Sequence, residues 1–315
     1  MTTTLVNVTC HCGTNKFKVA FHTSSLPIAS DLCHCNTCRH STGLMFIHTA
    51  PIINAPLASD ASPDDMAGKP ENLQHLKAYS KPSGRLTRDS DSWSVYTGIL
   101  EQPQGIVQVG AHRFVESTID GGFANHYPVV SGIELPRYKS MKEDGETLPF
   151  DWKAPKLLKA QETLFKANAT LSAYCDCKSI NLTLLRETTI TKPKPNVCKW
   201  STRHQLDLLD RVNIIDTYTS LPVVLDPKEG ETRTPGLAQY ESSPGIFRES
   251  CATCGAKVFY WTRNRKGGDI LDVGAGLLDQ EQEGSRADRW FAWADKVPHP
   301  DNPVDKMVLD DLRMD

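Results

Sequence analysis

Three cysteines within six residues are the feature of this sequence most able to do chemistry. They are Cys33, Cys35 and Cys38, in the spacing C-x-C-x-x-C. Thiolates are soft ligands that suit zinc, and a turn this short can direct all three sulfur atoms at one ion. Three protein ligands leave the fourth tetrahedral position to water or substrate, which is typical of a catalytic zinc. If Cys10 or Cys12 supplies a fourth thiolate, the centre is closed and structural.

Histidines and an arginine around this turn are candidates for catalytic roles. His34, His40 and His48 could transfer protons, because an imidazole titrates near neutral pH. Arg39 could hold a carboxylate, or it could orient the turn through backbone carbonyls. Each histidine could instead lie on the surface or support a metal ligand without touching substrate.

A second cysteine set has the spacing of a closed zinc site. Cys175 and Cys177 form a C-x-C pair, and Cys251 and Cys254 form a C-x-x-C pair. Two pairs on separate turns, far apart in sequence, are what a four-thiolate structural zinc needs, and its binding would contribute to folding. With the first turn, the sequence therefore predicts two zinc ions per chain.

Short strands and turns are expected to position both cysteine sets. Residues 5–21 predict a strand, a turn at residues 10–13 and a second strand with alternating apolar residues. Residues 44–48 predict a short buried strand, residues 50–75 a surface insertion and residues 157–166 a short helix. Many short strands between Gly, Pro and Ser turns predict a mainly β architecture with few short helices.

The second half of the sequence repeats features of the first. Residues 171–177 match the entry strand and the C-x-C turn that carries Cys10 and Cys12, and Val-Gly-Ala at 273–275 matches residues 109–111. Because these matches occur in the same order, a tandem duplication is the simplest explanation. We therefore expect domains at residues 1–135 and 168–315, with a linker at residues 136–167 between them.

The two copies differ where the chemistry lies. Residues 251–255 match residues 94–98, where both cysteines are missing, and the three-cysteine turn matches residues 197–204, where one cysteine remains. Serine and threonine at the unmatched positions are poor zinc ligands. Either the first domain lacks a structural metal, or Cys10 and Cys12 turn toward the three-cysteine site.

Composition excludes several functional classes. The chain has 315 residues, of which 39% are hydrophobic and 23% charged, enough for two globular domains. A net charge of −3 gives no sign of a nucleic-acid or membrane partner. The N-terminus lacks a secretory signal pattern, and no apolar run reaches the roughly 18 residues of a membrane span. We expect a cytoplasmic protein, where reducing conditions favour metal over disulfides.

Together these motifs resemble the glutathione-dependent formaldehyde-activating enzyme (GFA) family, which includes centromere protein V. The shared motifs are C-x-C-G, C-H-C-x-x-C-R, Y-x-S-x-P-G and C-x-x-C-G. The resemblance implies small zinc-binding β domains of the β-tent type, here in tandem. It also implies a catalytic zinc on Cys33, Cys35 and Cys38, and a structural zinc on the second set, Cys175, Cys177, Cys251 and Cys254.

The resemblance implies a carbon–sulfur lyase that acts on a small-molecule adduct, with glutathione as a candidate cosubstrate. Three thiolates weaken the Lewis acidity of zinc and favour a thiolate substrate as fourth ligand. Two alternatives stay open. One is a glutathione-independent zinc enzyme of a specialised pathway that catalyses elimination, hydration or cyclisation. The other is a non-catalytic zinc-binding module, for which the chain lacks a strongly basic tail.

Overall fold

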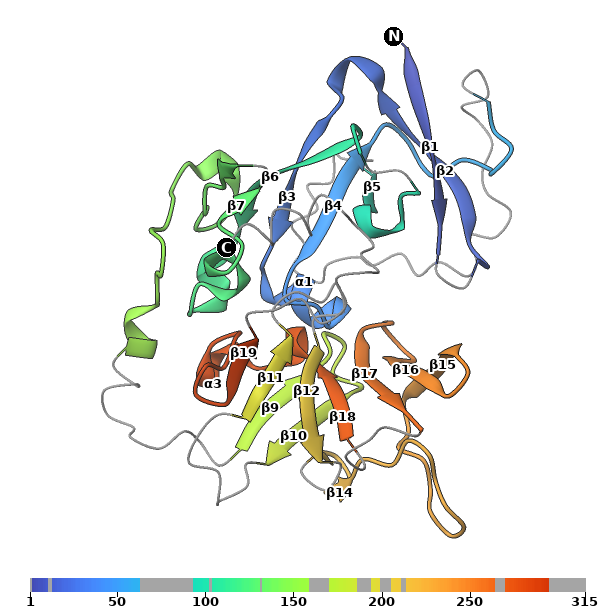
Figure 1. Ribbon diagram of the computed structural model, residues 1–315, viewed down its shortest axis with the longest axis vertical. Coiled ribbons are helices and arrows are strands. Elements are labelled where there is room, and N and C mark those ends of the chain that lie inside the picture. Colours follow the sequence, from blue (N-terminus) through green and yellow to red (C-terminus); the bar gives the residue numbers. More distant parts are fainter. Residues whose placement is uncertain are drawn as a thin grey trace. The chain divides into compact units, whose positions relative to one another are not determined.

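The computed structural model in Figure 1 describes residues 2–10, 13–62, 93–101, 104–130, 132–158, 170–185, 194–198, 205–210, 214–263 and 270–294. Over these residues the strands form several small sheets and the helices are short, which confirms the predicted mainly β architecture. Cys12, residues 63–75 of the predicted insertion and most of the helix predicted at 157–166 lie outside the described residues. No helix in the described part of the chain is long and apolar enough to cross a membrane.

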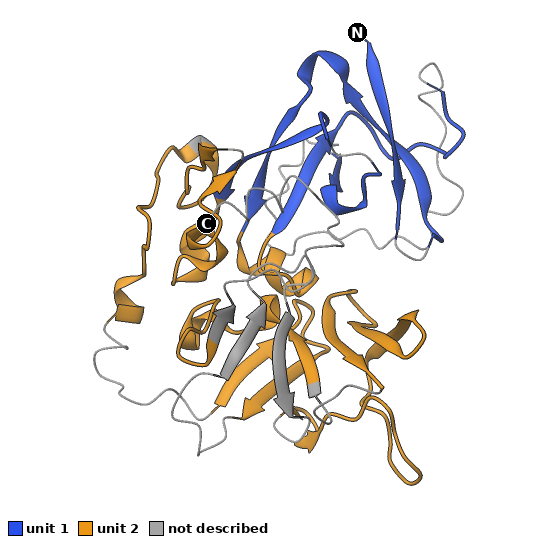
Figure 2. Ribbon diagram, viewed as in Figure 1, with its two compact units in different colours: residues 1–33, 47–112 blue, residues 34–46, 113–315 orange. Residues whose placement is uncertain are grey.

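The chain divides into two compact units, which Figure 2 shows in different colours. Unit 1 comprises Met1–Cys33 and Ile47–His112, and unit 2 comprises His34–Phe46 and Arg113–Asp315. Unit 2 therefore includes a segment from the N-terminal part of the sequence. The division of the sequence at 1–135, 136–167 and 168–315 stays a prediction.

Unit 1 is built on a hairpin and a four-stranded sheet. The hairpin pairs β1 (Thr3–Thr9) with β2 (Lys16–His22), as predicted, and its buried valines and phenylalanines form an apolar face. The sheet has the order β5-β4-β3-β6. Its strands are β3 (Ile28–Cys33), β4 (Ile47–Ile52), β5 (Trp93–Tyr96) and β6 (Val107–Arg113), the last of which ends in unit 2.

Unit 2 holds a four-stranded sheet of order β14-β13-β10-β9 and a seven-stranded sheet of order β15-β16-β17-β18-β12-β11-β19. The strands of the smaller sheet are β9 (Thr170–Tyr174), β10 (Asn181–Leu185), β13 (Ile214–Asp216) and β14 (Leu221–Pro222). Those of the larger are β11 (Lys194–Cys198), β12 (Gln205–Asp210), β15 (Leu237–Ser243), β16 (Ile246–Cys251), β17 (Lys257–Thr262), β18 (Ile270–Gly274) and β19 (Phe291–Ala294). The unit also contains the ribbon β7 (Val129–Val130) and β8 (Ile133–Glu134) and the helices α1 (Asn36–Thr42) and α3 (Gln280–Glu283).

The sheets of the two units share a pattern of connections. In unit 1 the strand order is β5-β4-β3-β6, and four adjacent strands of unit 2 have the equivalent order β18-β12-β11-β19. A 3₁₀ turn follows β5 and another follows β18, at η3 (Thr97–Ile99) and η8 (Ala275–Leu277). After each turn one residue pairs with the entry strand, Leu100 with Val8 and Leu278 with Ala173.

This register corrects two of the matches made from sequence. Residues 93–100 hold the place of residues 270–278, so the match of 94–98 to 251–255 is wrong. Strand β6 holds the place of β19, so the match of 109–111 to 273–275 is also wrong. A run of three small residues recurs easily, whereas the strand order depends on pairing along whole strands.

Candidate metal centres

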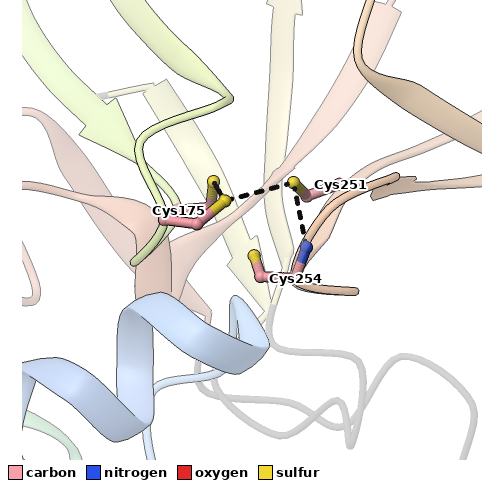
Figure 3. A group of neighbouring side chains, drawn as sticks. Cys175, Cys251 and Cys254 are labelled. Atoms are coloured by element: carbon pink, nitrogen blue, oxygen red, sulfur yellow. Dashed lines mark hydrogen bonds between the residues drawn. The ribbon is translucent and has the colours of Figure 1, made fainter. Parts of the chain in front are cut away.

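Four thiols of unit 2 converge on one point. Cys175 and Cys177 lie in the turn after β9, Cys251 ends β16, and Cys254 lies in the turn after it (Figure 3). Their sulfur atoms lie within 4.8 Å of one another, and those of Cys175 and Cys177 are 3.4 Å apart. Sulfur atoms on one tetrahedral zinc lie about 3.8 Å apart, because each Zn–S bond is about 2.3 Å long. This four-cysteine centre therefore fits zinc.

The thiols of the four-cysteine centre differ in acidity. Burial raises the pKa of Cys175 and raises that of Cys254 to about 11. Burial acts in the same direction at Cys177, but hydrogen bonds with Ser179 and with the neighbouring thiols outweigh it and lower the pKa to about 6. The protein itself thus favours a thiolate at Cys177, and a cation would be needed to ionise Cys175 and Cys254.

The C-x-C turn of the first half has the same backbone bonds as that of the second. The Ile180 N–H donates to the Cys175 sulfur at 3.3 Å, and the Asn15 N–H donates to the Cys10 sulfur at 3.2 Å. Cys10 nevertheless joins neither group of converging ligands among the described residues. Cys12, its predicted companion, lies outside the described residues.

The three cysteines predicted to bind zinc are brought together by a strand end and a helix. Cys33 ends β3, Cys35 is the N-cap of α1, and Cys38 lies in its first turn. Their sulfur atoms lie within 4.8 Å of one another. The Cys38 N–H donates to the Cys35 sulfur at 3.4 Å, as the Cys254 N–H does to Cys251 at 3.5 Å. The two C-x-x-C turns thus share this backbone hydrogen bond.

Among the described residues, this three-cysteine centre gathers three ligands. Over the residues that the structure describes, no further Cys, His, Asp or Glu joins the sulfur atoms within the same limit. Cys33 and Cys38 are buried, and Cys35 is partly exposed. The donor set fits a zinc ion that takes its fourth ligand from solvent or substrate.

Arg39, the residue after Cys38, is fully buried. Its Nη2 donates to Gln280 Oε1 at 2.7 Å and to Asn36 Oδ1 at 3.3 Å, while Nε and Nη1 find no partner among the described residues. Burial lowers the pKa of Arg39 to about 10, against the attraction of Asp120 and other negative groups. The guanidinium thus stays charged at neutral pH, and it can offset the net negative charge of three thiolates on one divalent ion.

His40 is held by the backbone and side chain of Tyr174. Its Nδ1 lies 2.7 Å from the Tyr174 carbonyl oxygen, and the two rings stack with centroids 4.3 Å apart. Because a carbonyl oxygen only accepts, Nδ1 carries the proton. Burial, followed by the charge of Arg39, lowers the pKa of His40 to about 4. The ring is therefore neutral at neutral pH.

His48 lies on β4, where hydroxyl groups contact both ring nitrogens. Nε2 bonds the Ser30 hydroxyl, and Nδ1 lies 2.9 Å from Thr97 Oγ1. Burial lowers the pKa of His48 to about 4, although a hydrogen bond with the Ser30 backbone acts in the opposite direction. His48 is thus a neutral residue of the unit 1 sheet, tied to β3 and η3.

His34 lies between the first two cysteines of the three-cysteine centre and is fully buried. Its backbone N–H donates to the Arg113 carbonyl at 2.9 Å. Its ring centroid lies 5.7 Å from that of Phe46, which in turn lies 5.0 Å from that of Phe123. The His34 ring therefore belongs to an aromatic cluster within unit 2, together with Phe46 and Phe123.

Three residues around α1 were absent from the sequence-based site. Tyr174 and Gln280 contact His40 and Arg39 across 134 and 241 residues of sequence, and the Asp176 N–H donates to the His40 carbonyl at 3.0 Å. Position beside Cys175 is the only sequence signal that marks Tyr174 and Asp176. No spacing links Gln280 to the cysteines.

Comparison with known proteins bears on the N-terminal part of the chain. Residues 5–78 match the family model of the glutathione-dependent formaldehyde-activating enzyme. Searches of curated proteins and of solved structures gave no significant match. The matched segment carries the whole three-cysteine centre, and the four-cysteine centre lies outside it. Residues 5–78 are thus similar to this family, and the chain has a second cysteine cluster, outside the matched segment, that could hold a metal ion such as zinc.

Proposed function

We propose that this chain is a zinc-dependent lyase, which acts at the three-cysteine centre on a small-molecule adduct of the glutathione or aldehyde type. The number of ligands is the observation that carries the proposal. Three thiols converge, and no fourth protein ligand joins them among the described residues. The matched family model, whose name specifies glutathione and formaldehyde, covers all three.

The chemistry of the donor set agrees with this role. Cys33, Cys35 and Cys38 would hold the ion, which supplies a site where a substrate thiolate can bind or a substrate oxygen can be polarised. Arg39 reduces the electrostatic cost of bringing an anionic sulfur to a centre that already carries three thiolates. These residues therefore favour a substrate that binds through sulfur.

We further infer that the second half is a duplicated zinc module whose four-cysteine centre has a structural role. The equivalent strand orders, the matching 3₁₀ turns and the common backbone of the C-x-C turns support this inference. Where the first half has three cysteines, the second keeps only Cys198, at the end of β11. The second module would then have a structural role, and the chemistry would take place at the three-cysteine centre of the first.

One observation favours a second candidate, a zinc enzyme that does not use glutathione. Arg39 and His40 are held by Gln280 and Tyr174, which lie outside the segment that matches the family model. The surroundings of α1 thus come in part from residues outside the matched segment. A substrate other than a glutathione adduct would fit such surroundings.

Metal content and turnover test the proposed function together. We expect two zinc ions in the purified protein and one in Cys35→Ser, which should keep its fold by circular dichroism and lose turnover. Cys177→Ser is the matched control, because it removes a thiol from the other centre. Unchanged zinc content in Cys35→Ser would contradict the proposal. Assays of aldehydes with and without glutathione separate the two candidate substrates.

A further inference from the structure

The C-terminal end of α1 is held by residues on both sides of Cys175. The Asp176 N–H donates to the His40 carbonyl at 3.0 Å, and the Tyr174 carbonyl accepts from the His40 ring at 2.7 Å. The last carbonyls of a helix have no partner within the helix, so Asp176 satisfies one of them. Tyr174 also stacks on His40 with an interplanar angle of 4°. We call residues 174–178 the first arm.

A second arm, residues 251–257, reaches the same end of α1. Gly43 ends the helix with a φ of +73°, and a Cβ built there would lie 2.0 Å from the Lys257 carbonyl oxygen. The Gly276 N–H donates to the Gly43 carbonyl at 3.1 Å, and a Cβ on Gly276 would lie 2.1 Å from the Leu44 oxygen. These are contacts between backbones, which leave no room for a side chain.

The four-cysteine centre joins the two arms. Its first pair of thiols lies on the first arm and its second pair on the second arm, and the sulfur atoms of Cys177 and Cys251 approach to 3.6 Å across 74 residues of sequence. Figure 3 shows α1, in blue, beside these cysteines. An ion bound by all four thiols fixes the separation of the two arms. Because both arms contact the C-terminal end of α1, the ion also fixes the position of that helix.

We propose that the four-cysteine centre is a positioning site for the three-cysteine centre. An ion in the former holds α1, which carries Cys35 and Cys38, and so raises the affinity of the latter for its own ion. Because such coupling is a free energy between two binding events, each centre strengthens the other by the same factor. The inference rests on the proposed function in one respect, that the three-cysteine centre binds a metal.

Cobalt titration of the metal-free protein measures the coupling directly, since Co²⁺ bound to thiolates absorbs in a characteristic way. Cys35→Ser reports the four-cysteine centre without its neighbour, and a fit of two coupled sites to the curve of the unaltered protein then gives the affinity of the three-cysteine centre. We expect this affinity to fall about tenfold or more in Cys254→Ser, the range seen when residues that support metal ligands are lost.

Gly276→Ala tests the same coupling with every cysteine in place. Its new methyl group should displace the backbone after α1, weaken the three-cysteine centre by about tenfold and leave the four-cysteine centre filled. Gly98→Ala is the matched control, because Gly98 holds the equivalent place in η3 and a Cβ there meets nothing within 4 Å. Tyr174→Leu should resemble Gly276→Ala, and Tyr174→Phe, which keeps the stacked ring, should resemble the unaltered protein.

Two results would overturn the inference in different ways. Unchanged affinity of the three-cysteine centre in Gly276→Ala and Tyr174→Leu would refute the positioning role and leave the proposed function intact. Failure of the unaltered protein to bind a second cobalt ion would refute the proposed function and this inference with it. If Cys254→Ser fails to fold, the glycine and tyrosine variants decide the matter.

Discussion

His48 carries a neutral ring at neutral pH, because burial lowers its pKa from 6.5 to about 4. Its nitrogens contact Ser30 and Thr97, residues that belong to the same sheet and to the 3₁₀ turn beside it. At the scale of single residues, the sequence marked three histidines as candidates for proton transfer. It could not predict their burial, which follows from strands that pair far along the chain.

This lowered pKa makes the stability of the protein depend on pH. Below about pH 6.5 the unfolded chain binds a proton at His48, whereas the folded chain does so only near pH 4. Stability is therefore complete above pH 6.5 and falls as the pH drops through this window, with His48 contributing at most about 2 kcal/mol of loss by pH 5. Urea unfolding at pH 7.5 and 5 measures the loss.

The share of His48 is isolated by substitution. His48→Gln should lose less stability between these pH values than the unaltered protein. His22→Gln is the control, because His22 lies at an exposed position on β2, and it should lose as much stability as the unaltered protein. Equal losses in all three proteins would show that His48 is not the group responsible.

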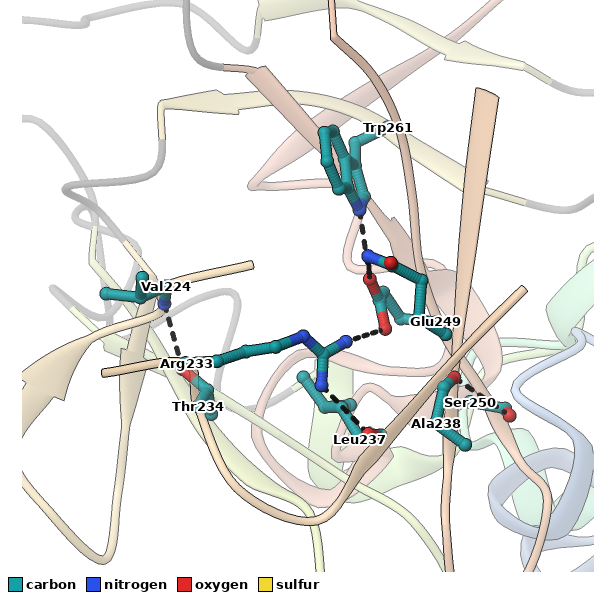
Figure 4. A network of polar contacts seen from close by, with 9 residues as sticks. Val224, Arg233, Thr234, Leu237, Ala238, Glu249, Ser250 and Trp261 are labelled. Atoms are coloured by element: carbon teal, nitrogen blue, oxygen red, sulfur yellow. Dashed lines mark hydrogen bonds and ion pairs between the residues drawn. The ribbon is translucent and has the colours of Figure 1, made fainter. Parts of the chain in front are cut away.

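At the scale of elements, Glu249 anchors the hairpin that carries the C-x-x-C turn. It lies buried on β16 and accepts hydrogen bonds from Gln239 Nε2 at 2.8 Å, from Trp261 Nε1 at 3.1 Å and from Arg233 (Figure 4). The three donors come from β15, β17 and the loop before β15. One carboxylate thus ties together the strands on both sides of β16, two residues before Cys251.

Glu249→Gln should destabilise the protein by about 2 kcal/mol, because a neutral amide cannot accept from all three donors and buried donors lose their partners. The exposed ion pair of Glu281 with Lys156 provides the control. Glu281→Gln should change the unfolding free energy by less than about 1 kcal/mol. Denaturant unfolding compares the two, and equal effects would contradict the anchoring role.

Elements set by local pattern were predicted, and elements set by distant contacts were not. The β1–β2 hairpin follows from alternating residues around a C-x-C turn, and it forms as expected. The strand expected at 44–48 begins instead at Ile47, because Gly43 ends α1 and the Leu44 carbonyl lies against Gly276. That contact spans most of the sequence, so no pattern near Leu44 could reveal it.

At the scale of the whole molecule, the sequence predicted both cysteine groups but not which unit contains α1. Metal ligands within one turn, or on two paired turns, leave a spacing that can be recognised without a structure. The docking of residues 34–46 into unit 2 leaves no such signal, since it depends on glycine backbones and on Gln280. The family match at 5–78 therefore describes only part of the surroundings of the three-cysteine centre.

Metal removal should affect the stability of the whole chain through the four-cysteine centre. Binding energy at a structural zinc site is folding energy, and zinc present at about a thousand times its dissociation constant adds about 4 kcal/mol. A strong chelator should then lower the melting temperature by about 10 °C, and added zinc should restore it. Cys35→Ser should show nearly the full chelator effect. Cys251→Ser should melt early and respond little, because the four-cysteine centre has lost one of its four thiolates. Melting curves that stay unchanged after zinc has left the unaltered protein would argue that hydrophobic packing alone holds the two arms together.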